Sequence, residues 1–240
     1  MLLLPKIYFQ FEAESAFLQR NYRPTITGPH HMYIKLRYRA RLNDPTQIEF
    51  LADEVEDICR SSGWKYHRWE EDWDQPNTLR LDNSEGGLHF EGHAPLRGVA
   101  FTPHPECESV WLTFTPDGIL QSLFTLQDPT FTATDTEYPW NRVKTGFDGP
   151  KTHLAICKLL RFLEKKYFAD LQVLDESGYW QHGDQARFET WMNQFTQDSK
   201  MLEEELEALH ADDSLAPEKK KEIMYRLFRQ FGERSRPEQD

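Results

Sequence analysis

The chain lacks the short motifs that identify several common enzyme classes. It has no Walker-type glycine loop, no GxGxxG motif after a strand, no HExxH and no GxSxG. These motifs provide a phosphate-binding loop, a dinucleotide-binding turn, a pair of zinc ligands and a nucleophilic serine. Their absence disfavours nucleotide hydrolysis by a P-loop, dinucleotide redox chemistry and the familiar kind of serine hydrolysis.

Cysteine is scarce and long apolar runs are missing. The 240 residues include three cysteines and no CxxC motif, which is typical of a chain from a reducing compartment. The apolar residues 1–4 are followed by Pro5 and Lys6, well short of the roughly 7–15 residues of a signal core. No run approaches the roughly 18 apolar residues of a membrane span. We therefore expect a cytoplasmic protein with no membrane segment.

Aromatic residues and acidic charge are plentiful. Hydrophobic residues make up only 38% of the chain, but aromatic residues reach 13%. Because each aromatic side chain can bury roughly 150–250 Å², we expect a folded core. The net charge of −12 opposes non-specific binding to nucleic acid or to an anionic membrane. The length suits one large domain, or one domain with a helical appendage.

Residues 33–41 show the strictest alternation in the chain. Ile34, Leu36 and Tyr38 alternate with a row of basic residues, which predicts a half-buried strand with a basic outer face. The basic residues are Lys35, Arg37, Arg39 and Arg41. They could contact a nucleic-acid backbone, or pair with acids of a neighbouring strand such as 70–72. The acidic net charge favours pairing.

Two helices are predicted in the first 182 residues. Asp44-Pro45 is a start signal for the first, and Gly63 is a stop signal. Gly149-Pro150 begins the second, over about 151–168. Ile58-Cys59-Arg60 and Ile156-Cys157-Lys158 occupy similar places in the two helices. This likeness predicts a degenerate internal repeat.

Short strand patterns surround these helices. Several are joined by connections too short for a parallel crossover, which favours a mainly antiparallel sheet. The predicted strands are 33–41, 64–73, 88–92, 98–102, 109–115, 119–124 and 130–134, and 137–149 is predicted to be a loop. The predicted fold class is α+β, with two packed helices and a C-terminal helical hairpin.

The C-terminal part is predicted to be helical throughout. Large apolar residues from 188 to 209 recur at spacings of three, four and seven, and Pro217 begins a second helix that ends at Gly232. Acidic residues 203–207 are expected to face lysines 219–221 across the hairpin. The predicted organisation is an α+β body at 1–182, a hairpin at 184–233 and a frayed tail at 234–240.

The histidines suggest one metal site. His89, Glu91 and His93 would share one face of a strand, and His104 follows in a proline-rich loop. Two imidazoles and a carboxylate suit zinc. A solvated strand face gives the same pattern and is favoured over a metal site. Separately, His153 at the start of a helix could serve in acid–base chemistry, but a packed histidine is favoured. Cys59 and Cys157 are interpreted as small core residues. Asp175-Glu176 could hold magnesium, but nothing in their spacing separates them from ordinary loop acids.

The resulting functional hypothesis is a non-catalytic interaction protein with no cofactor. Its partner would be another protein or a second copy, bound through the hairpin or through the aromatic and charged face of the sheet. Nucleic acid and membrane are not expected as partners. The candidate contact residues are Trp191, Phe195, Leu202, Leu206, Phe228 and Phe231. The alternative is a metal-dependent hydrolase that uses His89, Glu91, His93 and His104 with a divalent metal such as zinc.

Overall fold

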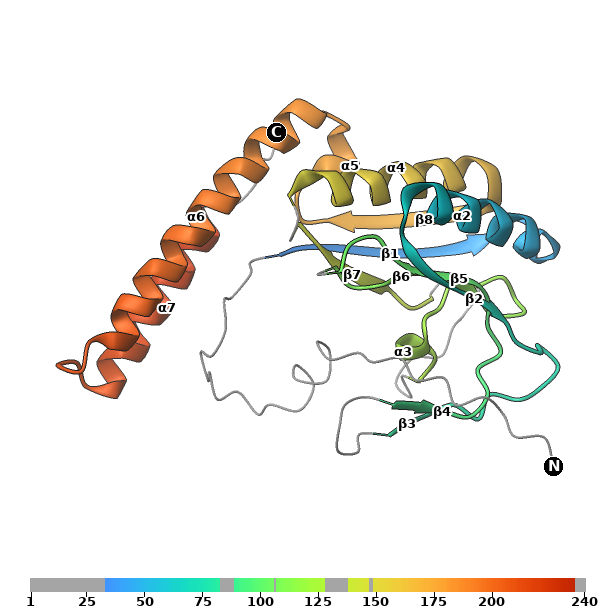
Figure 1. The fold of residues 1–240 in the computed structure, drawn as a ribbon, viewed down its shortest axis with the longest axis horizontal. Coiled ribbons are helices and arrows are strands. Elements are labelled where there is room, and N and C mark those ends of the chain that lie inside the picture. Colours follow the sequence, from blue (N-terminus) through green and yellow to red (C-terminus); the bar gives the residue numbers. More distant parts are fainter. Residues whose placement is uncertain (1–32, 83–88, 106, 128–137, 147–148, 236–240) are drawn as a thin grey trace.

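The computed structural model describes residues 33–82, 89–105, 107–127, 138–146 and 149–235. Helices α2 (Ile48–Ser62) and α4 (Pro150–Tyr167) cover one face of antiparallel strands, and a long helical pair extends from one end of the molecule (Figure 1). The fold is therefore α+β, as the strand spacing and helical periodicity predicted. Each covering helix lies between two strands in the chain, α2 between β1 and β2 and α4 between β7 and β8.

Within the described residues, the strands form two three-stranded sheets and one two-stranded sheet. All their pairings are antiparallel. The orders are β7-β1-β8, β2-β5-β6 and β3-β4. The bounds are β1 Ile34–Leu42, β2 Lys65–Glu70, β3 Arg80–Asp82, β4 His89–Glu91, β5 Arg97–Thr102, β6 Val110–Phe114, β7 Asn141–Thr145 and β8 Phe168–Asp175. Two isolated bridges, Arg41 with Ile119 and Phe114 with Leu120, join β1 to β6 through the segment 119–120.

The start and stop signals of α2 act as expected. The side chain of Asp44 accepts a hydrogen bond from the Thr46 backbone at the short 3-10 helix η1 (Pro45–Gln47), which leads directly into α2. Gly63 ends the helix with φ of 70°, a backbone conformation that glycine adopts at little cost. Local capping chemistry therefore fixes the beginning of η1 and the C-terminus of α2.

The main core lies between the helices and the strands. Every second residue of β1 is buried in it, from Ile34 to Leu42, together with the inward stripes of α2 and α4. Within this core, the Tyr38 hydroxyl donates to the Trp111 carbonyl at 3.1 Å and accepts from its amide at 2.8 Å. These bonds satisfy a buried phenol and tie β1 to β6.

A smaller apolar cluster packs around the second sheet. It includes Trp69 of β2 and Trp111 of β6, whose rings lie 5.9 Å apart, and Leu123 of the short helix α3 (Leu123–Leu126). Phe90 of β4 packs against Phe124 with ring centroids at 5.2 Å. The aromatic residues of these strands therefore serve mainly as core.

Several local expectations differ from the structure. Residues 141–145, expected to be loop, form β7, because the polar Asn141 and Thr145 are buried beside Val143 and conceal the apolar alternation. Residues 119–124, expected to be a strand, make only isolated bridges before Ser122 caps α3. The strand expected at 64–73 is shorter, at 65–70. The strand expected at 130–134 lies outside the described residues.

The C-terminal helical pair consists of α6 (Gln185–Ala211) and α7 (Pro217–Arg234), and a short helix α5 (Tyr179–His182) precedes it. Phe195 and Phe231 pack between α6 and α7 with ring centroids 5.6 Å apart. Helix α7 continues past the expected stop at Gly232 to Arg234. Among the described residues, no helix is long and apolar enough to cross a membrane.

The charges at the turn of the hairpin make contacts other than those expected. Lys219 pairs with Glu222 within α7, at 2.7 Å. Lys220 Nζ donates to the carbonyl of His210 at 2.9 Å, near the C-terminus of α6. A cation at this place satisfies a free helical carbonyl and complements the helix dipole. Lys220 therefore supports the hairpin by capping the C-terminal end of α6.

Candidate functional site

A buried polar cluster lies between the first turns of α4 and the ends of β7 and β8. Its members are Thr145 of β7, His153 and Cys157 of α4, and Asp175 and Ser177 at the end of β8. His153 and Cys157 are four residues apart and therefore share one face of α4. The side chains of His153 and Asp175 are fully buried, and Cys157 is fully buried as a residue.

The sheet register brings the other members to this helix face. Ile34 pairs with Thr145 on one side of β1, and Leu36 pairs with Asp175 on the other side. The ends of β7 and β8 therefore flank the same end of β1, below α4. These three strands are far apart in the chain, so only the folded sheet assembles the cluster.

The imidazole of His153 has a different environment at each nitrogen. Its Nδ1 lies 2.8 Å from Thr145 Oγ1. Its Nε2 lies 3.2 Å from Asp175 Oδ2, 3.2 Å from Ser177 Oγ and 3.6 Å from Cys157 Sγ. One ring nitrogen therefore faces a single hydroxyl, while the other faces a carboxylate, a hydroxyl and a thiol.

The carboxylate of Asp175 is fully engaged by hydrogen bonds. Its Oδ1 accepts from the Ser177 amide at 2.8 Å and from the Ser177 hydroxyl at 2.7 Å, and its Oδ2 accepts from the Trp180 amide at 2.9 Å. Burial raises the pKa of Asp175, but the hydrogen bonds and the charge of His153 outweigh it, so the pKa lies below the usual value. Asp175 is therefore ionised despite its burial.

Burial, and then the charge of Asp175, raise the pKa of the Cys157 thiol well above its ordinary value. The thiol therefore stays protonated unless a cation offsets both effects, and it is unsuited to act as a nucleophile by itself.

The cluster does not have the arrangement of a serine protease triad. In a triad, the carboxylate holds one imidazole nitrogen and the serine hydroxyl faces the other. Here Asp175 and Ser177 both face Nε2 of His153, and the Ser177 hydroxyl donates a hydrogen bond to Asp175. The geometry therefore supports ion pairing or metal coordination, and it does not support activation of Ser177.

A cavity of about 640 Å³ lies beside the cluster, at the base of the helical pair. Ser177 belongs both to the cluster and to the wall of this cavity. Other wall residues are Tyr179, Phe188, Trp191, Arg187 and Arg234. Phe188 also stacks on the imidazole of His153, with ring centroids 4.9 Å apart, so the beginning of α6 covers the cluster.

The predicted metal residues have mixed outcomes. The side chain of His89 lies outside what the structure describes, and Glu91 is exposed. Gly92, with φ of 98°, follows the end of β4, and His93 turns toward other partners. Its Nδ1 lies 3.1 Å from Glu71 Oε2 and its Nε2 lies 2.8 Å from the Asp72 carbonyl. His104 is partly buried in the following turn. A metal site at these residues remains a prediction.

The basic face of β1 meets partners other than Glu70, Glu71 and Asp72. That expectation is wrong, because β1 pairs with β7 and β8 while β2 belongs to another sheet.

Lys35, Arg39 and Arg41 of β1 contact other side chains. Lys35 pairs with Glu176 at 3.6 Å. Arg39 donates to the side chain of Gln172 at 2.8 and 3.0 Å and lies over the Trp140 ring. Arg41 lies 5.9 Å from the centre of the Tyr138 ring, and Arg37 is exposed.

The predicted interaction residues divide into two groups. Phe195, Leu202, Leu206 and Phe231 are buried, and Trp191 is partly buried with its Nε1 donating to the Ser235 carbonyl. Phe228, with 44% exposure, remains accessible. The buried residues stabilise the helical pair itself, so a partner would meet Phe228 and its exposed neighbours.

The sequence pattern led us to consider His153, Cys157 and Asp175 separately, without grouping them, and it did not single out Thr145 or Ser177. The spacing of His153 and Cys157 on the inward stripe of one helix was a usable signal, because two ligand-type side chains then share a buried face. Asp175 and Ser177 gave no such signal, since their approach to α4 depends on strand pairing. No protein-family model, curated protein or solved structure matches this chain.

Proposed function

We propose that this is a non-catalytic interaction protein whose C-terminal helical pair binds a protein partner. The observation that supports this proposal is the exposure of Tyr225 and Phe228, at 57% and 44%, on a helical pair that extends from the body (Figure 1). Lys221, Tyr225 and Phe228 are spaced by four and three residues and share one face of α7, here called the α7 face.

The α7 face has the composition of a contact surface. Aromatic residues are enriched at the centres of protein interfaces, where burial of each contributes about 1.5–3 kcal/mol. The surrounding residues of the pair are strongly charged, as expected of an interface rim. Acidic residues are concentrated on α6 and basic residues on α7: Glu203, Glu204, Glu205 and Glu207 on the first, and Lys219, Lys220, Lys221, Arg226 and Arg229 on the second.

This charge distribution favours a second copy of the chain as the partner. A two-fold axis along the helical pair sets α6 of one copy beside α7 of the other. Glu203 and Glu207 share a face of α6, and in that arrangement they lie beside Lys221 of the other copy. The aromatic residues of the two α7 faces are then buried at the centre, within a four-helix arrangement.

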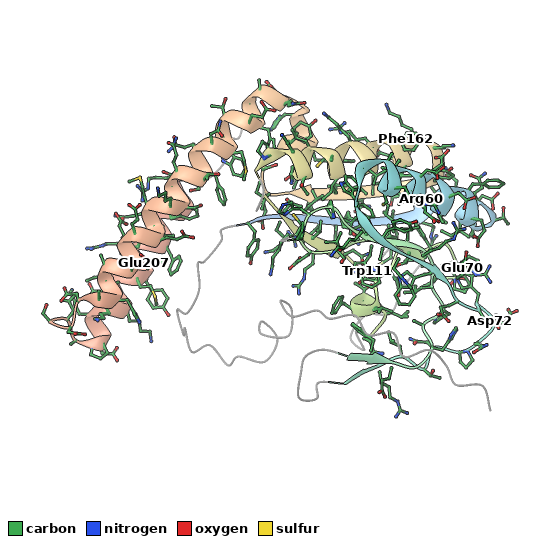
Figure 2. The ribbon with its side chains drawn as sticks, viewed as in Figure 1. Arg60, Glu70, Asp72, Trp111, Phe162 and Glu207 are labelled. Carbon is green, nitrogen blue, oxygen red and sulfur yellow. The ribbon has the colours of Figure 1, made fainter. Side chains whose placement is uncertain are left out.

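Sedimentation velocity over a range of concentrations tests this proposal. We expect the wild-type chain to dimerise, and we expect Tyr225→Glu/Phe228→Glu to weaken the dimer at least about 10-fold, because two buried rings are replaced by charges. Phe162→Glu is the matched control, since Phe162 is 45% exposed but lies on the outer side of α4, away from the helical pair (Figure 2). It should leave the dimer unchanged.

Two results would contradict the proposal. A wild-type monomer at all concentrations would exclude the second copy. If the wild-type and Tyr225→Glu/Phe228→Glu chains then also retained the same proteins from a lysate of the native host, the α7 face would have no partner.

A further inference from the structure

We propose that His153, Cys157 and Asp175 form a closed zinc site inside the body, with Ser177 as the fourth donor. The inference is independent of the proposed interaction surface. It rests on four observations: the ligand types, their spacing, the hydrogen bonds behind them and the charge they would balance. The donor atoms of the first three residues all lie within 4.8 Å of one another.

The measured spacing suits tetrahedral coordination. Zinc binds imidazole nitrogen at about 2.0–2.1 Å, thiolate sulfur at about 2.3 Å and carboxylate oxygen at about 2.0–2.2 Å. At a tetrahedral angle, a nitrogen and a sulfur ligand are then about 3.5 Å apart, and a nitrogen and an oxygen ligand about 3.4 Å apart. The distances from His153 Nε2 to Cys157 Sγ and Asp175 Oδ2 are 3.6 and 3.2 Å. These two distances match those of a tetrahedral site, and the thiol sulfur and the carboxylate oxygen lie within 4.8 Å of each other.

Thr145, which contacts Nδ1 of His153, favours the tautomer that would bind a metal through Nε2. A histidine that binds metal through Nε2 carries its proton on Nδ1, which needs an acceptor. Thr145 Oγ1 lies 2.8 Å from Nδ1 and 3.3 Å from the Ile34 carbonyl. Thr145 can therefore accept from His153 and donate to Ile34 at the same time, and both donors are satisfied.

The charges balance in a site where the side chains of His153 and Asp175 have no exposed surface. Zinc binding displaces the thiol proton of Cys157, which is released to solvent, and His153 binds through Nε2 with a proton on Nδ1. A dication with one thiolate and one carboxylate is then neutral, which removes the cost of burying a net charge. The combination of sulfur and nitrogen ligands favours zinc over magnesium or calcium, which prefer oxygen ligands.

The position of the site indicates a structural role. The side chains of His153 and Asp175 have no exposed surface, and structural zinc sites are closed in this way. The ion would join α4 to the end of β8. A structural zinc ion would also give His153 and Cys157 a role beyond packing in the core.

Cobalt substitution tests the proposal without any change in the site. Cys59→Ser/Cys107→Ser leaves Cys157 as the only cysteine of the chain. After removal of metal with a chelator, we expect Co²⁺ to give this variant and the wild type a thiolate-to-cobalt charge-transfer band and tetrahedral visible bands. Zinc should abolish both spectra at about one ion per chain and should raise the Tm above that of the chelator-treated protein.

Ligand variants provide the second readout. Cys157→Ser should weaken zinc binding at least about 100-fold, beyond the roughly 10–100-fold typical of losing an outer hydrogen-bond partner. Cys59→Ser is the matched control, because Cys59 is equally buried on α2 and should leave zinc binding unchanged. Circular dichroism will show whether each variant folds.

The proposal is overturned if the wild type and Cys59→Ser/Cys107→Ser give no charge-transfer band and zinc leaves the Tm unchanged. A band that persists in folded Cys157→Ser but is lost in Cys59→Ser/Cys107→Ser would also overturn it, since the metal would then bind elsewhere. In either case the cluster is a buried hydrogen-bonded pair of His153 and Asp175 beside a packed thiol.

Discussion

The hydroxyl of Thr145 lies between the imidazole of His153 and the carbonyl of Ile34, inside the core. A residue of similar size without a hydroxyl could not make these two hydrogen bonds, and other single side chains of this protein are equally hard to replace. A buried donor or acceptor without a partner costs about 1–3 kcal/mol, which is a large part of the stability of a typical domain. Substitutions that remove one or a few atoms at such positions should therefore change the free energy of unfolding measurably.

Thr145→Val tests this hydrogen bond. The substitution keeps the shape of the side chain but leaves His153 Nδ1 without a partner, so we expect the free energy of unfolding to fall by about 1–3 kcal/mol. Urea denaturation measures the change. Thr190→Val is the control, because the exposed Thr190 hydroxyl bonds only to the Ala186 carbonyl of its own helix. A loss no larger than that of Thr190→Val would show that the Thr145 hydroxyl is dispensable.

Substitution by alanine should change the stability of the protein in opposite directions at Gly98 and at Gly232. Gly98 lies in β5 with φ of 129°, and a Cβ there would overlap the Leu112 carbonyl. Gly232 lies in α7 with nothing within 4 Å of an added Cβ. We expect Gly98→Ala to destabilise the protein by more than about 2 kcal/mol, and Gly232→Ala to stabilise it by about 0.5–1 kcal/mol. Equal effects in urea denaturation would contradict this difference.

Among the secondary-structure elements, α2 and β2 are joined by an ion-pair network. Arg68 of β2 lies 2.7 Å from Glu49, 2.6 Å from Asp53 and 3.1 Å from Glu56, all on α2. Tyr66 of β2 also donates to Glu56 at 2.9 Å. The strand that follows α2 is therefore held to the helix by charges on its outer surface as well as by apolar contacts in the core.

This network predicts a pH dependence of stability. Burial raises the pKa of Glu56, but hydrogen bonds from Tyr66 and Arg68 and the nearby positive charges outweigh it, so the folded pKa lies below the ordinary 4.5. The contribution of Glu56 is therefore present above pH 4.5 and is lost as the pH falls through the folded pKa. We expect a loss below about 1 kcal/mol, because the network is partly exposed.

Urea denaturation at neutral and acidic pH measures this effect. Glu56→Gln should lower the free energy of unfolding at neutral pH. It should also reduce the difference in that free energy between neutral and acidic pH. Glu204→Gln, a change to an exposed acid of α6, should leave that difference as in the wild type. The same pH dependence in all three chains would show that Glu56 contributes nothing.

In the whole molecule, the base of the helical pair is part of the body core. Phe188 of α6 stacks on His153, and Met192 packs in the same core as Ile34. The outer half of the pair, including Glu207, extends away from the body (Figure 2). The boundary predicted at 182–184 therefore separates two units that share buried surface.

Removal of residues 184–240 tests that boundary. The deletion exposes the ring of His153 and takes away Phe188, whose loss as a single Phe188→Ala change should cost about 3–5 kcal/mol. We expect the shortened chain to lose at least as much, as measured by urea denaturation. Phe228→Ala is the control, because this exposed residue should change the stability by less than about 0.5 kcal/mol. A shortened chain as stable as the whole protein would confirm 1–182 as an independent body.

The sequence by itself determined the elements with strong local patterns: β1, the ends of α2, the beginning of α4 and the pair α6–α7. Their signals come from side chains two to four residues apart, which lie on one face of a strand or helix whatever the rest of the chain does. β7 was missed because its inward residues include Asn141 and Thr145, whose burial depends on distant partners.

Only the tertiary structure decided which strands flank β1, and therefore what surrounds His153. Asp175 comes from β8 and Thr145 from β7, and both reach the imidazole because each strand pairs with the same end of β1. Strand pairing depends on the burial of side chains across the whole sheet, so no local pattern specifies it. The residue types of the cluster were in the sequence, but their meeting is a property of the folded core.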